Sequence, residues 1–412
     1  MKYLVSFVLI LLIFKSFSQE KDLKFYIEKA QKNSPLLKDL KNQIQSNSID
    51  SLILRASYKT QVNANAFANY APIIDSVGYD SAVTNGQTLT ALIGLRKNII
   101  PKTVINSQAN SYKLIKEAVV LNKKIATKDL NKAITSQYIA ASGTSEQVLY
   151  NQKIEKLLKD EGLILKKLTQ NSVYKQTDYL IFLSTIKNQE YTVLQFKQQY
   201  QNDLGLLNYL SGEVDSTFVQ LKKPEIALQS VQKSEKSIFF KQFEIDSLRF
   251  QNQNKLIDNA YKPQFSLLAD AGYLSSFAIT PHKNFGVSVG AGLTIPIYDG
   301  GQRSLNHQKI TVGLATNAAY KNNFTKQYQQ QLLLLNQKLK QTKSLENQLQ
   351  SQLIIVDALI EANKKLLVTG DALITEYVLA LGNLISIKNA IAQNQINILQ
   401  LINEINYWKL NE

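Results

Sequence analysis

The sequence predicts a mixed α/β membrane protein with long antiparallel helices and four transmembrane β-strands. Three observations support this fold class. Four segments of about ten residues alternate between apolar and polar side chains, and a tilted strand of that length can cross a bilayer. Two very long stretches have helical spacing and no proline. The whole pattern also occurs twice along the chain.

The N-terminal segment Met1–Ser18 has the features of a secretory signal peptide. Lys2 provides a positive start, Tyr3–Phe14 is an apolar run, and small residues follow where a peptidase would cut. A membrane anchor would need roughly 20 apolar residues, but Lys15 interrupts the run earlier. We therefore expect an exported chain that begins near Gln19. No later run is as apolar, so contact with a membrane would have to come from strands.

The composition excludes several kinds of site. The chain has no cysteine, so it can form no disulfide, thiolate metal site or thiol nucleophile. Its histidines, His282 and His307, are expected to be solvated, because a metal site would need further ligands around one of them. The net charge of +15 would favour nucleic-acid binding in the cytosol, but this chain is predicted to be exported and its lysines are scattered. We expect no metal, no cofactor and no nucleic-acid partner.

Three short segments recur in the same order and indicate a duplication of one large unit. The first repeat is predicted at residues 19–215 and the second at residues 216–412, each with a helix, two strands, a long helix and a final helix. The recurring pairs are Thr177–Leu180 with Thr375–Val378, Gly94–Leu95 with Gly292–Leu293, and Tyr58–Gln61 with Tyr261–Gln264.

In each predicted strand, apolar side chains share one face and polar side chains share the other. The intervening segments 71–87 and 274–283 are predicted external loops. A soluble sheet with one wet face would show the same alternation, so the strands alone leave both possibilities open. The predicted strands are residues 59–70, 88–97, 263–273 and 284–296.

Helices are predicted for most of the remaining chain. The segments 104–168 and 302–368 contain no proline and few glycines, so each can form one helix of roughly 100 Å. Such a helix cannot be buried in a compact domain and should pack along a partner helix, here 173–210 and 374–410. A soluble coiled-coil rod would have similar helices, but it would not have strands between them.

The segment Pro296–Arg303 leads from the last predicted strand into a long helix. Pro296 ends the strand ladder because it has no amide hydrogen, and the aromatic residue Tyr298 follows it. Asp299 can accept hydrogen bonds from free amides at the helix start. The glycines at 300 and 301, Gly300 and Gly301, allow a sharp turn.

This motif, together with Tyr261–Leu267 before the third strand and the duplicated order of elements, resembles the TolC-like outer-membrane efflux family. The resemblance covers nearly the whole mature chain. It implies a homotrimer in which each protomer gives four strands to one 12-stranded β-barrel, continued by a helical tunnel in the periplasm. Physics also requires further copies, since four strands in lipid leave two open edges.

The resemblance also implies a function and partners. Proteins of this family are outer-membrane channels, the passive exit ducts of tripartite efflux or type I secretion systems. The implied partners are a periplasmic adaptor, an inner-membrane pump of the RND, ABC or MFS class, and outer-membrane lipid. The sequence has no nucleotide-binding loop to supply energy, and we expect no enzyme activity.

Acidic residues near the turns between paired helices are the gate candidates. The resemblance assigns Glu376 to a position where the family narrows its tunnel, whereas Leu379 stands where a second acid is usual. Asp178 occupies the equivalent place in the first repeat, and Asp371 lies in the second turn. Acids are favoured at helix starts whatever their function, so a purely structural role is the alternative.

Two other functions remain open from the sequence. A soluble periplasmic coiled-coil adaptor or structural protein would have the helices but would need no lipid-facing strands. An enzyme would need histidine, serine or carboxylate residues that converge on one site, and the sequence shows no such set at recognisable spacing.

Overall fold

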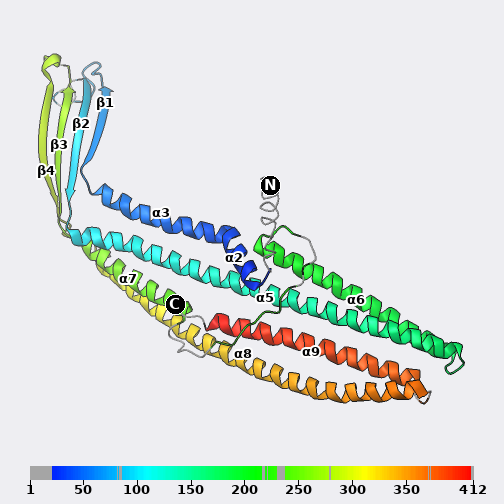
Figure 1. The fold of residues 1–412 in the computed structure, drawn as a ribbon. Helices are drawn as coiled ribbons and strands as arrows, with labels where there is room; N and C mark the ends of the chain where they lie inside the picture. Colours follow the sequence, from blue (N-terminus) through cyan, green and yellow to red (C-terminus); the bar gives the residue numbers. More distant parts are fainter. Residues whose placement is uncertain are drawn as a thin grey trace, which may run out of the picture. The chain divides into compact units, whose positions relative to one another are not determined.

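The computed structural model describes residues 21–80, 82, 86–215, 219, 221–229, 237–277, 280–369, 371 and 373–409 (Figure 1). The predicted signal peptide lies outside these residues. Long helices and a four-stranded antiparallel sheet make up this part of the chain, as the predicted fold class requires. The helices are α2 (Leu23–Asn33), α3 (Pro35–Ser57), α5 (Lys102–Gln170), α6 (Gln176–Ser211), α7 (Lys241–Ala260), α8 (Gln302–Thr369) and α9 (Ile374–Trp408). The strands are β1 (Gln61–Tyr70), β2 (Gln87–Ile99), β3 (Gln264–Ser275) and β4 (Phe285–Thr294).

The chain forms two compact units. The first consists of Met1–Lys38, Lys124–Ile238 and Thr325–Glu412, and the second of Asp39–Lys123 and Phe239–Phe324. Each unit therefore contains segments from both predicted repeats. The boundary between the repeats at residues 215 and 216 stays a prediction.

The sheet belongs to the second unit, and its strands follow one another in the order β1-β2-β3-β4. β1 begins at Gln61 rather than at the predicted residue 59. The Lys59 amide still donates a hydrogen bond to the Ala56 carbonyl, so Lys59 belongs to the end of α3. β2 and β3 extend beyond their predicted ends, because they pair with each other as far as Ile99 and Ser275.

β4 ends at Thr294, although residue 296 was predicted as the last of the strand. Thr294 pairs with Gln264 at the start of β3. The next pair would bring Ile295 opposite Pro263, which has no amide hydrogen to donate. The ladder therefore stops before Pro296 is reached.

The register places most of the apolar side chains of the four strands on one face of the sheet, although Phe67, Leu92 and Leu268 lie on the other. Successive side chains of a strand point to opposite faces, so adjacent rows of paired residues alternate between the two faces. The predicted alternation thus runs across the sheet and gives one mainly apolar and one mainly polar face. A row on the apolar face is Val62, Leu95, Ala269 and Val289, and the adjacent row on the polar face is Asn63, Gly94, Asp270 and Ser288.

α6 begins at Gln176 rather than at the predicted residue 173. Ser172 has a φ of 62°, and the Val173 amide donates to the Leu168 carbonyl, so these residues close the end of α5. The ends of α5, α8 and α9 lie within two residues of the predicted ones. The long helices are confirmed.

In the first unit, α2, α5 and α6 pack around a cluster of buried residues that includes Tyr26, Tyr138 and Tyr200. Gly143 of α5 lets α9 approach closely, because a Cβ there would lie 2.3 Å from the Ile396 side chain. Across the described residues, no helix combines the length and hydropathy that a membrane span requires.

Candidate functional site

The turn from β4 into α8 is organised by the Asp299 carboxylate. Its oxygens accept hydrogen bonds from the Gly301 amide at 2.9 Å, the Arg303 amide at 2.7 Å and the Tyr261 hydroxyl at 2.5 Å. Gly300 and Gly301 have φ values of 67° and 86°, which side chains rarely allow. The acid thus satisfies amides at the start of α8 that have no partner within the helix.

Hydrogen bonds and an ion pair at this turn connect α7 to α8. The hydrogen bonds from the Tyr261 hydroxyl and the Arg303 amide hold the pKa of Asp299 below its usual value. The same bond to Asp299 raises the pKa of Tyr261. The Arg303 guanidinium lies 2.7 Å from the Asp258 carboxylate, whose pKa it lowers, and 5.4 Å from the centre of the Tyr261 ring.

The other motif residues are exposed. Pro296 lies just beyond the end of β4, and the Tyr298 side chain is 88% exposed. Ile297 between them is 94% exposed. These residues extend the apolar surface of β4 toward α8 rather than packing under the turn.

The histidines differ in their surroundings. His282 lies in a short 3-10 turn between β3 and β4. His307 was expected to be solvated, but it is only partly exposed and lies between α7 and α8. Its Nδ1 is 2.9 Å from the Asn254 Oδ1, and its Nε2 is 3.1 Å from the Asp258 Oδ1. Within the described ranges, no group of three or more His, Cys, Asp or Glu residues could hold a metal ion.

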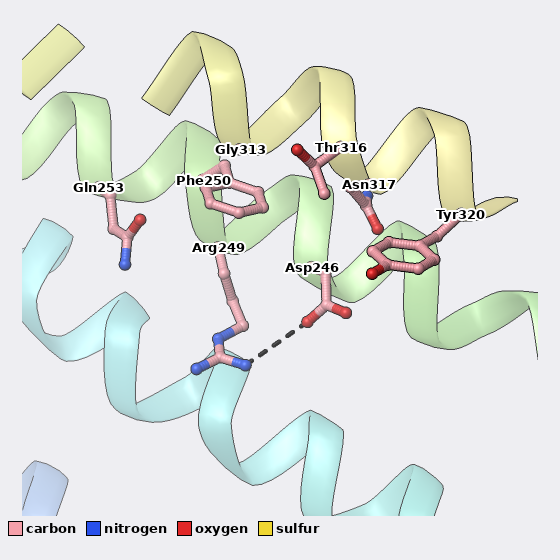
Figure 2. Close-up of a pocket in the computed structure, with 8 residues that line it drawn as sticks. All are labelled: Asp246, Arg249, Phe250, Gln253, Gly313, Thr316, Asn317 and Tyr320. Atoms are coloured by element: carbon pink, nitrogen blue, oxygen red, sulfur yellow. Dashed lines mark hydrogen bonds and ion pairs between the residues drawn. The ribbon is translucent and has the colours of Figure 1, made fainter. Parts of the chain in front are cut away.

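A groove of about 400 Å³ lies between α7 and α8 in the second unit (Figure 2). Gly313 makes room for the Phe250 ring, since a Cβ at Gly313 would lie 2.5 Å from it. Asp246 and Arg249 form a 3.5 Å ion pair along one side. This groove was not predicted from the sequence, although the lone glycine of α8 could have indicated close contact at that point. Its other lining residues are Gln253, Thr316, Asn317 and Tyr320.

Two of the gate candidates lie beside the turns of the helix pairs, Asp178 in the first turn of α6 and Asp371 between α8 and α9. The Asp178 carboxylate accepts a hydrogen bond from the Lys175 amide at 3.1 Å, which closes the first turn of α6. The Tyr174 hydroxyl donates to the Leu367 carbonyl at 2.8 Å. Burial raises the pKa of Tyr174, and the nearby charges of Asp178 and Asp371 raise it further. Both carboxylates therefore lie near this tyrosine.

Glu376 is the third residue of α9, as Asp178 is of α6, but its surroundings differ. The Glu376 side chain is exposed, and its carboxylate has no hydrogen-bond or ion-pair partner in the part of the chain that the structure describes. Leu379, one turn later, is 67% exposed. An uncompensated carboxylate therefore stands beside an exposed apolar side chain.

A buried tyrosine follows Glu376 directly. The Tyr377 hydroxyl donates to the Glu161 Oε2 at 2.5 Å, and its ring stacks on Phe182. Burial and the Glu161 charge raise the pKa of Tyr377. The other oxygen, Glu161 Oε1, is 3.6 Å from the Lys364 ammonium. This contact could not be predicted from the sequence, because its partners lie on different helices and share no regular spacing.

No protein-family model matches the sequence. A search of curated proteins also finds no match.

Solved structures do match the fold. CusC matches with a TM-score of 0.76 at 10% identity, with 96% of this chain and 93% of that chain covered. The CusC structures describe conformational changes that accompany folding and transmembrane channel formation. The outer membrane protein VceC of Vibrio cholerae has a TM-score of 0.73 at 14% identity, with 94% and 96% covered. A membrane protein from Pseudomonas aeruginosa has a TM-score of 0.74 at 14% identity, with 94% and 89% covered.

These likenesses extend over almost the whole of each chain and include both the sheet and the long helices. The protomer fold that the resemblance implied, long helices with a four-stranded sheet, is confirmed. The chain has the fold of a TolC-type outer-membrane channel protomer.

Proposed function

We propose that the chain is one protomer of a homotrimeric outer-membrane channel, the passive exit duct of a tripartite efflux or type I secretion system. The observation that carries this proposal is the continuous apolar face of the sheet. Val289 on that face is 86% exposed and Val287 is 81% exposed. Large apolar side chains gathered on one exposed face mark a surface that is covered by lipid or by protein.

The open edges of the sheet argue for lipid and for three copies. β1 and β4 each pair on one side only in the protomer. In a bilayer, unpaired backbone groups are not tolerated, so other copies must complete the ladder. Three copies of four strands give a closed barrel of 12 strands, which is wide enough to leave a pore because barrel diameter grows with strand number.

The helices would then extend the pore into the periplasm. The long α5 and α8 are covered by partner helices along part of their length, and α8 leaves large apolar side chains such as Leu333, Ile354 and Ile355 exposed in the protomer. Transport through such a duct is passive, and a periplasmic adaptor with an inner-membrane RND, ABC or MFS pump would supply the substrate and the energy. CmeC and MtrE, two further proteins of this fold, are outer membrane channels.

Glu376 is the proposed charged residue at the narrow periplasmic end. Its exposure and the absence of a partner among the described side chains support this role. In a trimer, one such carboxylate per protomer forms a ring, which raises the local concentration of cations. Asp178 and Asp371 remain candidates for the same region, and Asp178 also has the structural role described above.

The proposal can be tested by cell fractionation and by measuring the mass of the protein in detergent. The mature protein should fractionate with the outer membrane and form trimers in mild detergent, as measured by light scattering after subtraction of bound detergent. A monomeric mass, or recovery in the soluble periplasmic fraction, would contradict the proposal.

A further inference from the structure

The two ends of the sheet differ in charge. We define the base of the sheet as the end marked by Gln61, Ile99, Gln264 and Thr294, where the strands meet the helices (Figure 1). At the opposite end, the described charged residues are Asp75, Asp80 and Lys283. The residues within and beside the strands at the base are positively charged, namely Lys59, Arg96, Lys97, Lys102 and Lys262.

These base cations have no acidic partners. All five side chains are exposed, and none of them forms an ion pair within the described ranges. The nearby carboxylates are already occupied: Asp258 binds Arg303, and Asp299 accepts from Tyr261 and two amides. The positive charge is therefore available to an anion from outside the chain.

Lys97 stands at the border of the apolar face. It lies in β2 between Leu95 and Ile99, which are two positions away on either side, so it shares their face. It pairs with Leu267, which is also on that face. Ile297 and Tyr298 add exposed apolar and aromatic surface at the same end.

A cation at the edge of an apolar surface favours an amphipathic partner. A soluble anion would match the lysines but would leave the exposed apolar rows in water. The tail of a lipid can cover those rows, while the flexible lysine stems bring their ammonium groups to its phosphate. An acidic headgroup adds a net negative charge that a zwitterionic headgroup lacks.

We propose that the base of the sheet is a binding surface for acidic glycerophospholipids, with Lys97 at its centre and Lys59, Lys102 and Lys262 around it. This inference rests on the proposed function, because it requires the apolar face to lie in a bilayer. It adds a headgroup preference and assigns that preference to one end of the sheet. In a trimer the surface would occur three times around the barrel.

The experiment is native mass spectrometry of the full mature trimer in mild detergent, with phosphatidylglycerol and phosphatidylcholine of identical tails in competition. The wild type should retain more phosphatidylglycerol. Lys97→Gln should lower that preference by about fivefold, since a lysine near an anionic surface is worth about that factor. Lys97→Gln with Lys262→Gln should lower it further.

Two matched variants make the result specific. Lys283→Gln removes the same charge at the opposite end of the sheet and should leave the preference unchanged, and Lys97→Arg should retain it. The inference is overturned if Lys97→Gln keeps the wild-type preference, if Lys283→Gln loses as much, or if glycerol phosphate displaces the lipid at equal concentration. If no trimer forms, the proposed function fails; if trimers form without a headgroup preference, only this inference fails.

Discussion

The two halves of the chain differ in which helix starts with a hydrogen-bonded acid. In the second half it is the long helix α8, and in the first half it is the shorter helix α6. In the second half, Asp299 bonds the first amides of α8 where the sheet ends, and Glu376 at the start of α9 stands free among the described residues. In the first half, neither the residues between β2 and α5 nor the first turn of α5 contain an acid, and Asp178 is bonded at the start of α6. Equivalent positions therefore keep the same fold with different partners.

The physical reason lies in side-chain length and in competing groups. A helix start needs some acceptor for its free amides, and the short Asp side chain reaches back to the chain just before the helix. Glu376 has one more methylene group, and its side chain is exposed. The two helices thus carry an acid at the same helical position but give it different surroundings.

The strands of the two halves should respond in the same way to matched substitutions. Val289→Arg in β4 and Ala91→Arg in β2 both place a charge on the apolar face, at a cost of roughly 2–4 kcal/mol near the middle of a bilayer. Their polar-face neighbours Ser288→Arg and Thr90→Arg should be tolerated. The measurement is the yield of heat-resistant trimer in outer membranes. Equal tolerance of arginine at positions 288 and 289 would contradict the assignment of the faces.

The tyrosines after the two acids should differ. Tyr377→Phe removes the donor to the Glu161 carboxylate and should destabilise the trimer by about 1–3 kcal/mol, because a buried acceptor loses its partner. Tyr179→Phe should have almost no effect, since the hydroxyl of this half-buried residue has no partner in the described part of the chain. Thermal melting of the trimer measures both changes. Equal losses of thermal stability for the two variants would contradict the expected difference between the two tyrosines.

The two junctions between sheet and helix should respond differently to acid. Because the folded pKa of Asp299 is depressed, its contribution to stability is present above its unfolded value, about 3.9, and is lost as pH falls through the lower folded value. Asp299→Asn should therefore lower the melting temperature at neutral pH, and the difference from wild type should shrink below about pH 4.

Thr103→Ala, at the corresponding junction of the first half, is the matched control and should change the melting temperature little at any pH. A constant difference between wild type and Asp299→Asn across the acid range would show that the carboxylate charge has no part in holding the turn.

Substitution of Glu376 should have the smallest effect on stability. Its effect should appear instead in the ion selectivity of the channel. Glu376→Lys should move the reversal potential in planar bilayers toward anion selectivity, most clearly at about 0.01 M salt, where the Debye length is about 30 Å. Asp178→Asn should weaken the start of α6 but change the reversal potential far less. Unchanged selectivity in an intact Glu376→Lys trimer would mean that this residue does not face the pore.

The local pattern was sufficient for much of the fold. Alternation along β1 to β4 identified both faces of the sheet, and the absence of proline identified the long helices, because each signal depends on the spacing of neighbouring residues. The ends were less accurate where a distant residue decides them. β4 stops at Thr294 because Pro263 lies just before the paired strand β3, which no property of β4 itself could indicate.

By itself the sequence determined the four strands, the long helices and the acid-glycine-glycine turn, since all of these depend on local periodicity and short motifs, and the resemblance of these motifs to a known family implied the TolC-type fold. Only the tertiary structure decided which carboxylates are used and which are free. It joined Tyr377 to Glu161, Arg303 to Asp258 and Asp178 to the Lys175 amide, and it left Glu376 and the base lysines without acidic or basic partners among the described residues. The reason is that a hydrogen bond or ion pair depends on distances of about 3 Å between atoms, and those distances are set by packing between segments far apart in the chain.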